Sequence, residues 1–188
     1  MTLTGRVLHL LTDAQAIRRQ LDGADLSATD LEGPYSYGVN TDAMISGRAC
    51  TFGYTPEILG PYFLQHFLDV MPEDGVRSGG FQVVVGGHAY GSGSSREVAV
   101  VAHQGAGIEL VVADSFQRIF QENMVYSGMP FTTDRGVLDR LEAGESVDPA
   151  SFHQTLPPFF RAVAETGGLL PYGTALLAGE IGPTYATE

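Results

Sequence analysis

A loop rich in glycine and serine holds the residues most able to do chemistry in this 188-residue sequence. It reads Gly-Gly-His-Ala-Tyr-Gly-Ser-Gly-Ser-Ser-Arg-Glu over residues 86–97. Its glycines allow the backbone to approach a ligand closely. Ser94 and Ser95 are expected at the start of a helix, whose free N–H groups favour an anion. Arg96 adds a planar guanidinium that matches a carboxylate or phosphate, so the loop predicts a site for a multiply charged anion beside an activated hydroxyl.

Two other interpretations of this loop stay open on the residues alone. In the first, Ser94 caps the helix and Arg96 pairs with a surface carboxylate, as is common. In the second, Gly91 and Gly93 begin a dinucleotide-binding fingerprint, with Asp114 as the ribose-binding acid. Arg96 stands where that fingerprint needs its third glycine. A serine-hydrolase elbow is excluded because Gly-x-Ser-x-Gly does not occur in the sequence.

Composition narrows the classes of function. The chain has 10 basic and 22 acidic residues, a net charge of −12, and every basic residue is an arginine. The missing lysine excludes a Schiff-base lysine and a P-loop, and the acidic balance argues against nucleic acid or a membrane surface as partner. Cys50 is the single cysteine, so no internal disulfide can form and a cytoplasmic location is expected. One thiol cannot alone hold a metal cluster.

The segments around the loop follow the order strand, loop, helix, strand and helix. An apolar run at 81–85 predicts a buried strand before the loop. An apolar stripe over 96–103 predicts a helix after it, and residues 108–113 predict the next strand. Asp114 or Ser115 is expected to cap a further helix. This βαβ pattern predicts an α/β layer that presents the loop at the end of a strand.

Other segments are predicted from their apolar spacing and their turn residues. The polar stretch 23–38 is expected to leave the core, and Asp13 is expected to cap the helix that precedes it. The remaining predictions are a first strand over 5–11, helices over 13–21, 54–70, 134–143 and 159–165, and a closing strand at 175–177.

Several segments, in the right order, resemble the aconitase superfamily. Residues 90–97 resemble its Gly-x-Gly-Ser-Ser-Arg-Glu-His segment, and residues 113–120 resemble its Ser-Phe-Ala-Arg-Ile-Phe helix. Residues 40–48 are similar to its Asn-Thr-Asp-x-Ile-Ile-Pro-Gly-Arg segment. Residues 128–130 resemble the Gly-Leu-Pro that follows, and residues 167–172 resemble C-terminal ends in part of the family.

The resemblance implies a fold, a reaction and a partner. It identifies residues 1–188 as a single α/β domain, an aconitase-like swivelling β/β/α domain of the kind found as the small subunit of 3-isopropylmalate dehydratases. An insertion at 13–37 and a C-terminal extension from about residue 145 are expected. In that family a large subunit holds a [4Fe–4S] cluster, and the reaction removes and re-adds water on a hydroxy di- or tricarboxylate. The resemblance therefore implies a hydro-lyase active only as a heterodimer or heterotetramer.

The same resemblance assigns roles to individual residues. Ser94 would be the catalytic base that takes a proton from the carbon beside a carboxylate, and Ser95 and Arg96 would bind the substrate carboxylate. Asp42 would lie at the rim of the site, and Arg48 would contribute to substrate binding. No metal ligand is expected in this chain. The loop that senses the variable side chain of the substrate would comprise Ala49, Cys50, Thr51, Phe52 and Gly53.

Three departures from the family pattern leave the substrate open. Val98 stands where the family has a histidine that packs and hydrogen-bonds behind the loop, and Ser46 stands where it has a proline. The insertion at 13–37 is longer than expected for an enzyme of the leucine pathway. Homocitrate or a hydroxyacid of secondary metabolism are therefore alternatives to a 3-isopropylmalate-like substrate. A non-catalytic carboxylate-binding module of the same fold is a further alternative.

Overall fold

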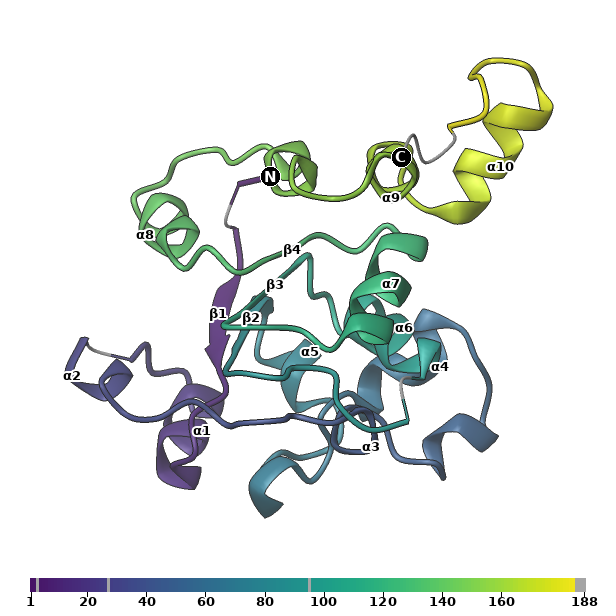
Figure 1. Cartoon of the computed structure of the whole chain (residues 1–188). Coiled ribbons are helices and arrows are strands. Elements are labelled where there is room, and N and C mark those ends of the chain that lie inside the picture. The colour runs from purple at the N-terminus through teal and green to yellow at the C-terminus, as the bar shows by residue number, and fades with distance from the viewer. Residues whose placement is uncertain (3, 27, 95, 185–188) are drawn as a thin grey trace.

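A parallel sheet forms the centre of the fold in the computed structural model, which describes residues 1–2, 4–26, 28–94 and 96–184 (Figure 1). Its strands follow the chain order across the sheet: β1 Arg6–His9, β2 Phe81–Gly86, β3 Leu110–Ala113 and β4 Phe131–Thr132. Every neighbouring pair is parallel, so the carboxyl ends of these strands lie along one edge. Ligands bind at this edge in open parallel sheets. The predicted α/β class is confirmed.

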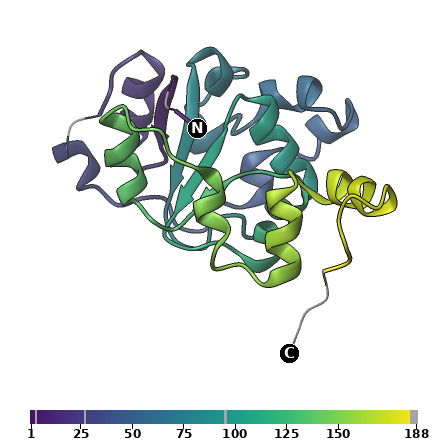
Figure 2. The same ribbon diagram turned by 90° about the horizontal axis from the view of Figure 1, so that it is seen from above.

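Helices cover both faces of the sheet. They are α1 Ala14–Leu21, α2 Ala28–Leu31, α3 Thr41–Met44, α4 Pro56–Leu59, α5 Gly75–Ser78, α6 Glu97–Gly105, α7 Arg118–Tyr126, α8 Gly136–Glu142, α9 Pro158–Glu165 and α10 Leu169–Leu177. Short 3₁₀ turns are η1 Ala49–Thr51, η2 Gly60–Tyr62, η3 Phe67–Asp69 and η4 Pro149–His153. Figures 1 and 2 place α1, α2 and α8 toward the β1 side of the molecule, and α10 at the opposite side.

Alternating side chains of the central strands form two hydrophobic cores. Val84 and Val111 face the larger core, which also takes side chains from α6 and α7. Val83, Val85 and Val112 face the smaller core, together with side chains of α8. Because both faces are covered, the central strands are continuous apolar runs, which is how the sequence revealed them. Among the described helices, none combines the length and the apolar character needed to cross a membrane.

Several predicted elements are confirmed. The strand predicted over 5–11 is β1, and the helix predicted over 13–21 is α1. The side chain of Asp13 caps α1 by accepting a hydrogen bond from the backbone N–H of Gln15 at 2.9 Å. The polar stretch 23–38 carries α2 and then returns to the end of the first strand, where Leu11 and Tyr35 form an antiparallel bridge.

Two predictions were wrong. The helix predicted over 54–70 is broken into α4, η2 and η3. Left-handed residues at Leu64 and His66 turn the chain between η2 and η3, and Leu68 is left-handed within η3. The apolar spacing continues through these turns, so periodicity alone did not reveal the breaks. The closing strand predicted at 175–177 is instead the last turn of α10, because a short apolar run fits a strand or a helix equally well.

Two glycines bring α6 and the α4–η2 segment into backbone contact. A Cβ on Gly105 would lie 1.9 Å from the carbonyl oxygen of Pro56, and a Cβ on Gly60 would lie 2.2 Å from the carbonyl carbon of Gly105. Neither position has room for a side chain unless the backbones separate. The end of α6 is therefore fixed by close packing.

We expect Gly105→Ala to lower the free energy of unfolding by about 1–3 kcal/mol, because the added methyl group must push two backbones apart. Gly173→Ala is the matched control, since nothing lies within 4 Å of a Cβ at that position in α10. It is expected to be neutral or to stabilise the fold by about 0.5–1 kcal/mol. Urea unfolding followed by circular dichroism measures both variants, and equal stabilities would contradict the close contact.

Candidate active site

The glycine- and serine-rich loop leaves the carboxyl end of β2 and is paired on one side with the segment before α3. The backbone N–H of Gly91 donates to the carbonyl of Val39 at 2.9 Å. The backbone N–H of Thr41 donates to the carbonyl of Ser92 at 2.9 Å. These bonds extend parallel pairing beyond the end of the sheet, so this side of the loop has a fixed conformation.

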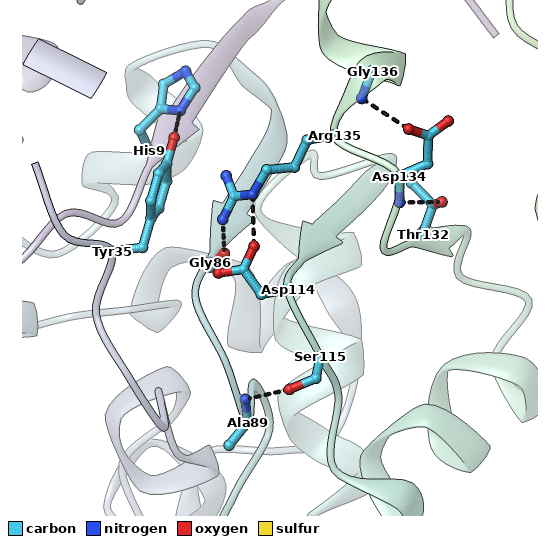
Figure 3. A network of polar contacts seen from close by, with 10 residues as sticks. All are labelled: His9, Tyr35, Gly86, Ala89, Asp114, Ser115, Thr132, Asp134, Arg135 and Gly136. Carbon is cyan, nitrogen blue, oxygen red and sulfur yellow. Dashed lines mark hydrogen bonds and ion pairs between the residues drawn. The ribbon is translucent and has the colours of Figure 1, made fainter. Parts of the chain in front are cut away.

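On its other side the loop is paired with the segment that follows β3. The backbone N–H of Tyr90 donates to the carbonyl of Ser115, and the backbone N–H of Gln117 donates to the carbonyl of Tyr90, each at 2.9 Å. The hydroxyl of Ser115 also accepts from the backbone N–H of Ala89 at 2.9 Å (Figure 3). The loop therefore lies between two neighbours that both hydrogen-bond to its backbone.

Glycine is required at Gly91 by contacts within the fold. Its φ is +80°, and a Cβ there would lie 2.1 Å from Cγ of Phe120. The sequence analysis expected this glycine to let a ligand approach the backbone; the group that lies against it in the structure is a core side chain of α7. Gly93 has φ +89°, and its nearest neighbour outside the loop is Asn40, the N-cap of α3.

Ser94 is exposed and lies two residues after Ser92, the last loop residue in the backbone pairing described above. Its Oγ is 3.2 Å from Oγ1 of Thr41, which is fully buried at the start of α3. The interpretation of Ser94 as a helix cap was wrong, because the N-cap of α6 is Arg96, whose side chain makes no capping hydrogen bond. Ser95 lies outside the described residues.

Arg96 and Asp42 meet beside Ser94, as an ion pair between the loop and α3. One guanidinium N–H of Arg96 lies 2.8 Å from the carboxylate of Asp42, and the two side chains are 35% and 59% exposed. Gly47 lies beside the same guanidinium, because a Cβ there would be 3.7 Å from Nη1. The structure thus brings Asp42 together with Ser94 and Arg96, although Asp42 lies more than 50 positions before them in the sequence. A ligand carboxylate at this exposed guanidinium would compete with Asp42.

The predicted specificity segment follows Gly47 and lines a separate hollow. Ala49 is buried, and Cys50 is half-buried against the main core. Thr51 is exposed, and its hydroxyl donates to the carbonyl of Arg48 at 2.7 Å. Gly53 has φ +153° and lies against Ile58. The hollow has a volume of about 370 Å³ and is lined by Ser46, Arg48, Ala49, Phe52, Tyr62, Gln65, His66 and Glu73.

An arginine that sequence reasoning missed clamps the two strand ends from which the loop and its neighbour emerge. Nε of Arg135 donates to the carboxylate of Asp114 at 2.7 Å, and Nη2 donates to the carbonyl of Gly86 at 2.9 Å (Figure 3). Its guanidinium also lies 4.0 Å from the ring centre of Tyr35. Nothing local marked Arg135, because its partners lie far from it in the sequence.

The Arg135–Asp114 ion pair, here called the clamp, contradicts both roles that the sequence suggested for Asp114. This residue neither caps a helix nor remains available to a ribose, because its carboxylate is bound to Arg135. The N-cap of α7 is Gln117, three residues later in the chain. The hydrogen bond from Arg135 holds the pKa of the Asp114 carboxyl below its ordinary value, so the clamp stays charged at neutral pH.

A histidine extends the same polar cluster to β1. Nδ1 of His9 lies 2.8 Å from the hydroxyl of Tyr35 (Figure 3). Burial, aided by the charge of Arg135, lowers the pKa of His9 to about 4. His9 is therefore neutral in the folded protein at neutral pH, and its bond ties the polar excursion to the end of the first strand.

A buried tyrosine–histidine pair supports the loop from behind. The hydroxyl of Tyr90 lies 2.8 Å from Nε2 of His103 in α6, and both side chains are fully buried. Nδ1 of His103 donates to the carbonyl of Ala99 at 2.6 Å, so Nε2 accepts from Tyr90. Val98, which replaces a family histidine, packs against the core. The loop thus has a polar support, at residues that the sequence did not single out.

Comparison with known proteins identifies the family. The model of the aconitase C-terminal domain matches residues 71–135, which include the loop and both clamp residues. The isopropylmalate/citramalate isomerase small subunit of Methanocaldococcus jannaschii is 31% identical over 152 residues, covering 73% of this chain and 88% of that protein. The chain belongs to the aconitase superfamily. The resemblance inferred from the sequence is therefore confirmed.

Two further comparisons concern the sequence of a relative and the fold of a solved structure. The 3-isopropylmalate dehydratase small subunit 1 of Methanopyrus kandleri is 34% identical over 146 residues, covering 70% of this chain and 84% of that protein. The crystal structure of a 3-isopropylmalate dehydratase from Methanocaldococcus jannaschii aligns with a TM-score of 0.53 and 24% identity. That alignment covers 77% of this chain and 92% of the other, so the two share a fold.

Burial lowers the pKa of His103 from 6.5 to about 4, so the side chain is neutral at neutral pH and stability should depend on pH. Below pH 6.5 the unfolded chain binds a proton at this residue that the folded chain does not, until the pH nears 4. We expect the free energy of unfolding to fall across that window as pH is lowered, by about 3 kcal/mol from this residue.

Urea unfolding at a series of pH values measures this slope. The double variant Tyr90→Phe with His103→Leu replaces the pair by apolar side chains. It should remove the part of the slope that comes from His103, while His9, whose pKa is also lowered to about 4, keeps its own contribution. A slope that is the same in the wild type and the double variant would contradict the assignment to His103.

Proposed function

We propose that this chain is the small subunit of a hydro-lyase that dehydrates and rehydrates a 2- or 3-hydroxy di- or tricarboxylate of the 3-isopropylmalate kind. The observation that carries the proposal is the placement of the Ser94 hydroxyl and the Arg96 guanidinium at the exposed end of a loop fixed on both sides. This reaction needs two things from protein side chains: a proton acceptor and a guanidinium that binds a carboxylate through two hydrogen bonds. Relatives named as dehydratase and isomerase small subunits support the reaction class.

In this proposal Ser94 is the base. Its Oγ accepts the proton from the carbon beside a substrate carboxylate, and the electron pair left behind forms the double bond as the hydroxyl departs. A serine hydroxyl is a weak base unless its ionised form is stabilised. The charge of Arg96 and the start of α6 favour that anion, and Thr41, 3.2 Å away, can donate a hydrogen bond to it.

Arg96 is proposed to bind a substrate carboxylate by exchange with Asp42. The ion pair with Asp42 is exposed to water on both sides, and such pairs contribute little to stability. Displacing Asp42 therefore costs little free energy compared with what is gained when the guanidinium forms two hydrogen bonds to the substrate carboxylate. Ser95 is proposed as a second contact from the family resemblance, and Arg48 from its place beside Gly47.

We propose that a large subunit holds a [4Fe–4S] cluster, in a heterodimer or heterotetramer. Cys50 is the single cysteine of the sequence, so this chain cannot supply the three thiolates of such a cluster. Within the part of the chain that the structure describes, no three His, Cys, Asp or Glu side chains group closely enough to hold a metal ion. When bound, the cluster supplies the Lewis acid for the departing hydroxyl. A reducing cytoplasm is the proposed location, because it suits a free thiol.

The substrate side chain is proposed to be selected by the segment after Gly47. The relative from Methanocaldococcus jannaschii is named for isopropylmalate and citramalate, two malates with different alkyl substituents. Arg48 and Phe52 line the same hollow. The ring centres of Phe52 and Tyr62, which also lines it, are 5.4 Å apart. An apolar wall beside a charged side chain suits a hydroxyacid that carries an alkyl group.

We expect Ser94→Ala to reduce turnover at least about 10²-fold, because the proton loses its acceptor. The complex with a cluster-loaded large subunit should form normally, which size-exclusion chromatography checks. Ser151→Ala is the control, a change of an exposed hydroxyl in η4. Absorbance of the unsaturated intermediate measures turnover of 3-isopropylmalate, citramalate, citrate and homocitrate. Undiminished turnover in Ser94→Ala would place the base elsewhere.

We expect Arg96→Lys to raise the KM for the hydroxyacid about tenfold, because lysine keeps the charge but loses the two-pronged donor geometry. The effect on kcat should be smaller. Arg118→Lys is the matched control, since Arg118 is 83% exposed and pairs only loosely with Glu122 at 3.5 Å. Steady-state kinetics of the complex separate the two constants, and an unchanged KM in Arg96→Lys would remove Arg96 from the binding site.

A further inference from the structure

An uncharged helix near the end of the described chain presents exposed leucines. α10 contains no Asp, Glu, Lys, Arg or His, and it packs mainly against α9 and α7. Figures 1 and 2 both show it projecting from the side of the molecule away from β1. Of its residues only Tyr172 is buried, while Leu170 is 81% and Leu177 is 92% exposed. Apolar side chains this exposed and this close together mark an interaction surface.

These leucines border a hollow whose lining includes Glu97, the residue after Arg96. The hollow has a volume of about 510 Å³ and lies between α10, α7 and the start of α6. From α10 it is lined by Leu169, Leu170 and Leu177, and its opposite wall is formed by Glu97, Asn123 and Tyr126. Glu97 directly follows Arg96 in the chain. The wall of the hollow that faces the leucines therefore starts next to the residue proposed to hold the substrate carboxylate.

We infer that this hollow, with the α10 leucines, is a docking surface for the cluster-bearing large subunit. The inference rests on the proposed function. A partner that supplies the Lewis acid must come within the length of a small dicarboxylate of Ser94 and Arg96. Its surface then also lies against the start of α6, where the hollow opens. Removing Leu170 and Leu177 from water would provide the apolar centre that stable interfaces contain.

Charge argues against a second copy of this chain as the occupant. Each copy carries a net charge of −12, so two copies repel each other. Within the described lining, Glu97 is the charged residue, and a symmetric contact would bring two such carboxylates near each other. A different chain that offers an apolar patch and a cation opposite Glu97 matches both properties.

The test is a titration of separately purified chain against the cluster-loaded large subunit. Leu170→Asp and Leu177→Asp are each expected to raise the dissociation constant at least tenfold, measured by isothermal titration calorimetry. More of each variant should be needed for half-maximal turnover. Leu68→Asp is the matched control, because this leucine of η3 is 38% exposed and lines no part of the hollow. Circular dichroism checks that the variants fold.

The possible outcomes separate the two proposals. Unchanged affinity in both α10 variants, with a wild-type chain that binds and is active, would overturn the docking surface and leave the proposed function standing. A wild-type chain that does not bind the large subunit would contradict the proposed function itself. Dimers of the chain alone in sedimentation, abolished by Leu170→Asp, would assign the surface to a second copy and overturn the inference.

Discussion

The backbone pairing of the loop after β2 is the constraint on which the rest of the candidate site depends. The sheet ends at Gly86, but parallel hydrogen bonding continues between the loop and the segments 38–41 and 115–117. A stretch so rich in glycine would have high conformational entropy if it were free. With the loop paired on both sides, Ser94 is exposed at its end, and the half-buried Arg96 lies two residues further along the chain.

Two side-chain clusters fix the same loop from different directions. Arg135 binds the carbonyl of Gly86, where the loop begins, and Tyr90 bonds to His103 at the middle of the loop. Buried polar groups are costly unless they are paired, so each cluster favours one loop conformation over its alternatives. The position of Ser94 relative to Thr41 and Arg96 is thus set by residues that themselves stay away from the proposed substrate.

The sequence predicted what depends on neighbouring residues and missed what depends on distant ones. The strand, loop and helix around Ser94 follow from a continuous apolar run, clustered glycines and an apolar stripe, all of which are local. Asp42 came from the family resemblance alone, because its pairing with Arg96 requires the fold. Arg135 gave no signal, since its partners Asp114 and Gly86 are distant in the sequence. The helix predicted over 54–70 failed because apolar spacing persists through left-handed turns.

The central claim is that the reaction site is completed only when two different chains meet. The most direct test mixes this chain with a separately prepared, cluster-loaded large subunit and follows formation of the unsaturated acid as the ratio of the two is varied. The account predicts that neither component turns over 3-isopropylmalate or a related hydroxyacid alone, and that the rate rises with added chain until the two are stoichiometric. Full activity of the large subunit alone, or an intact cluster-loaded complex inert toward every such acid, would contradict it.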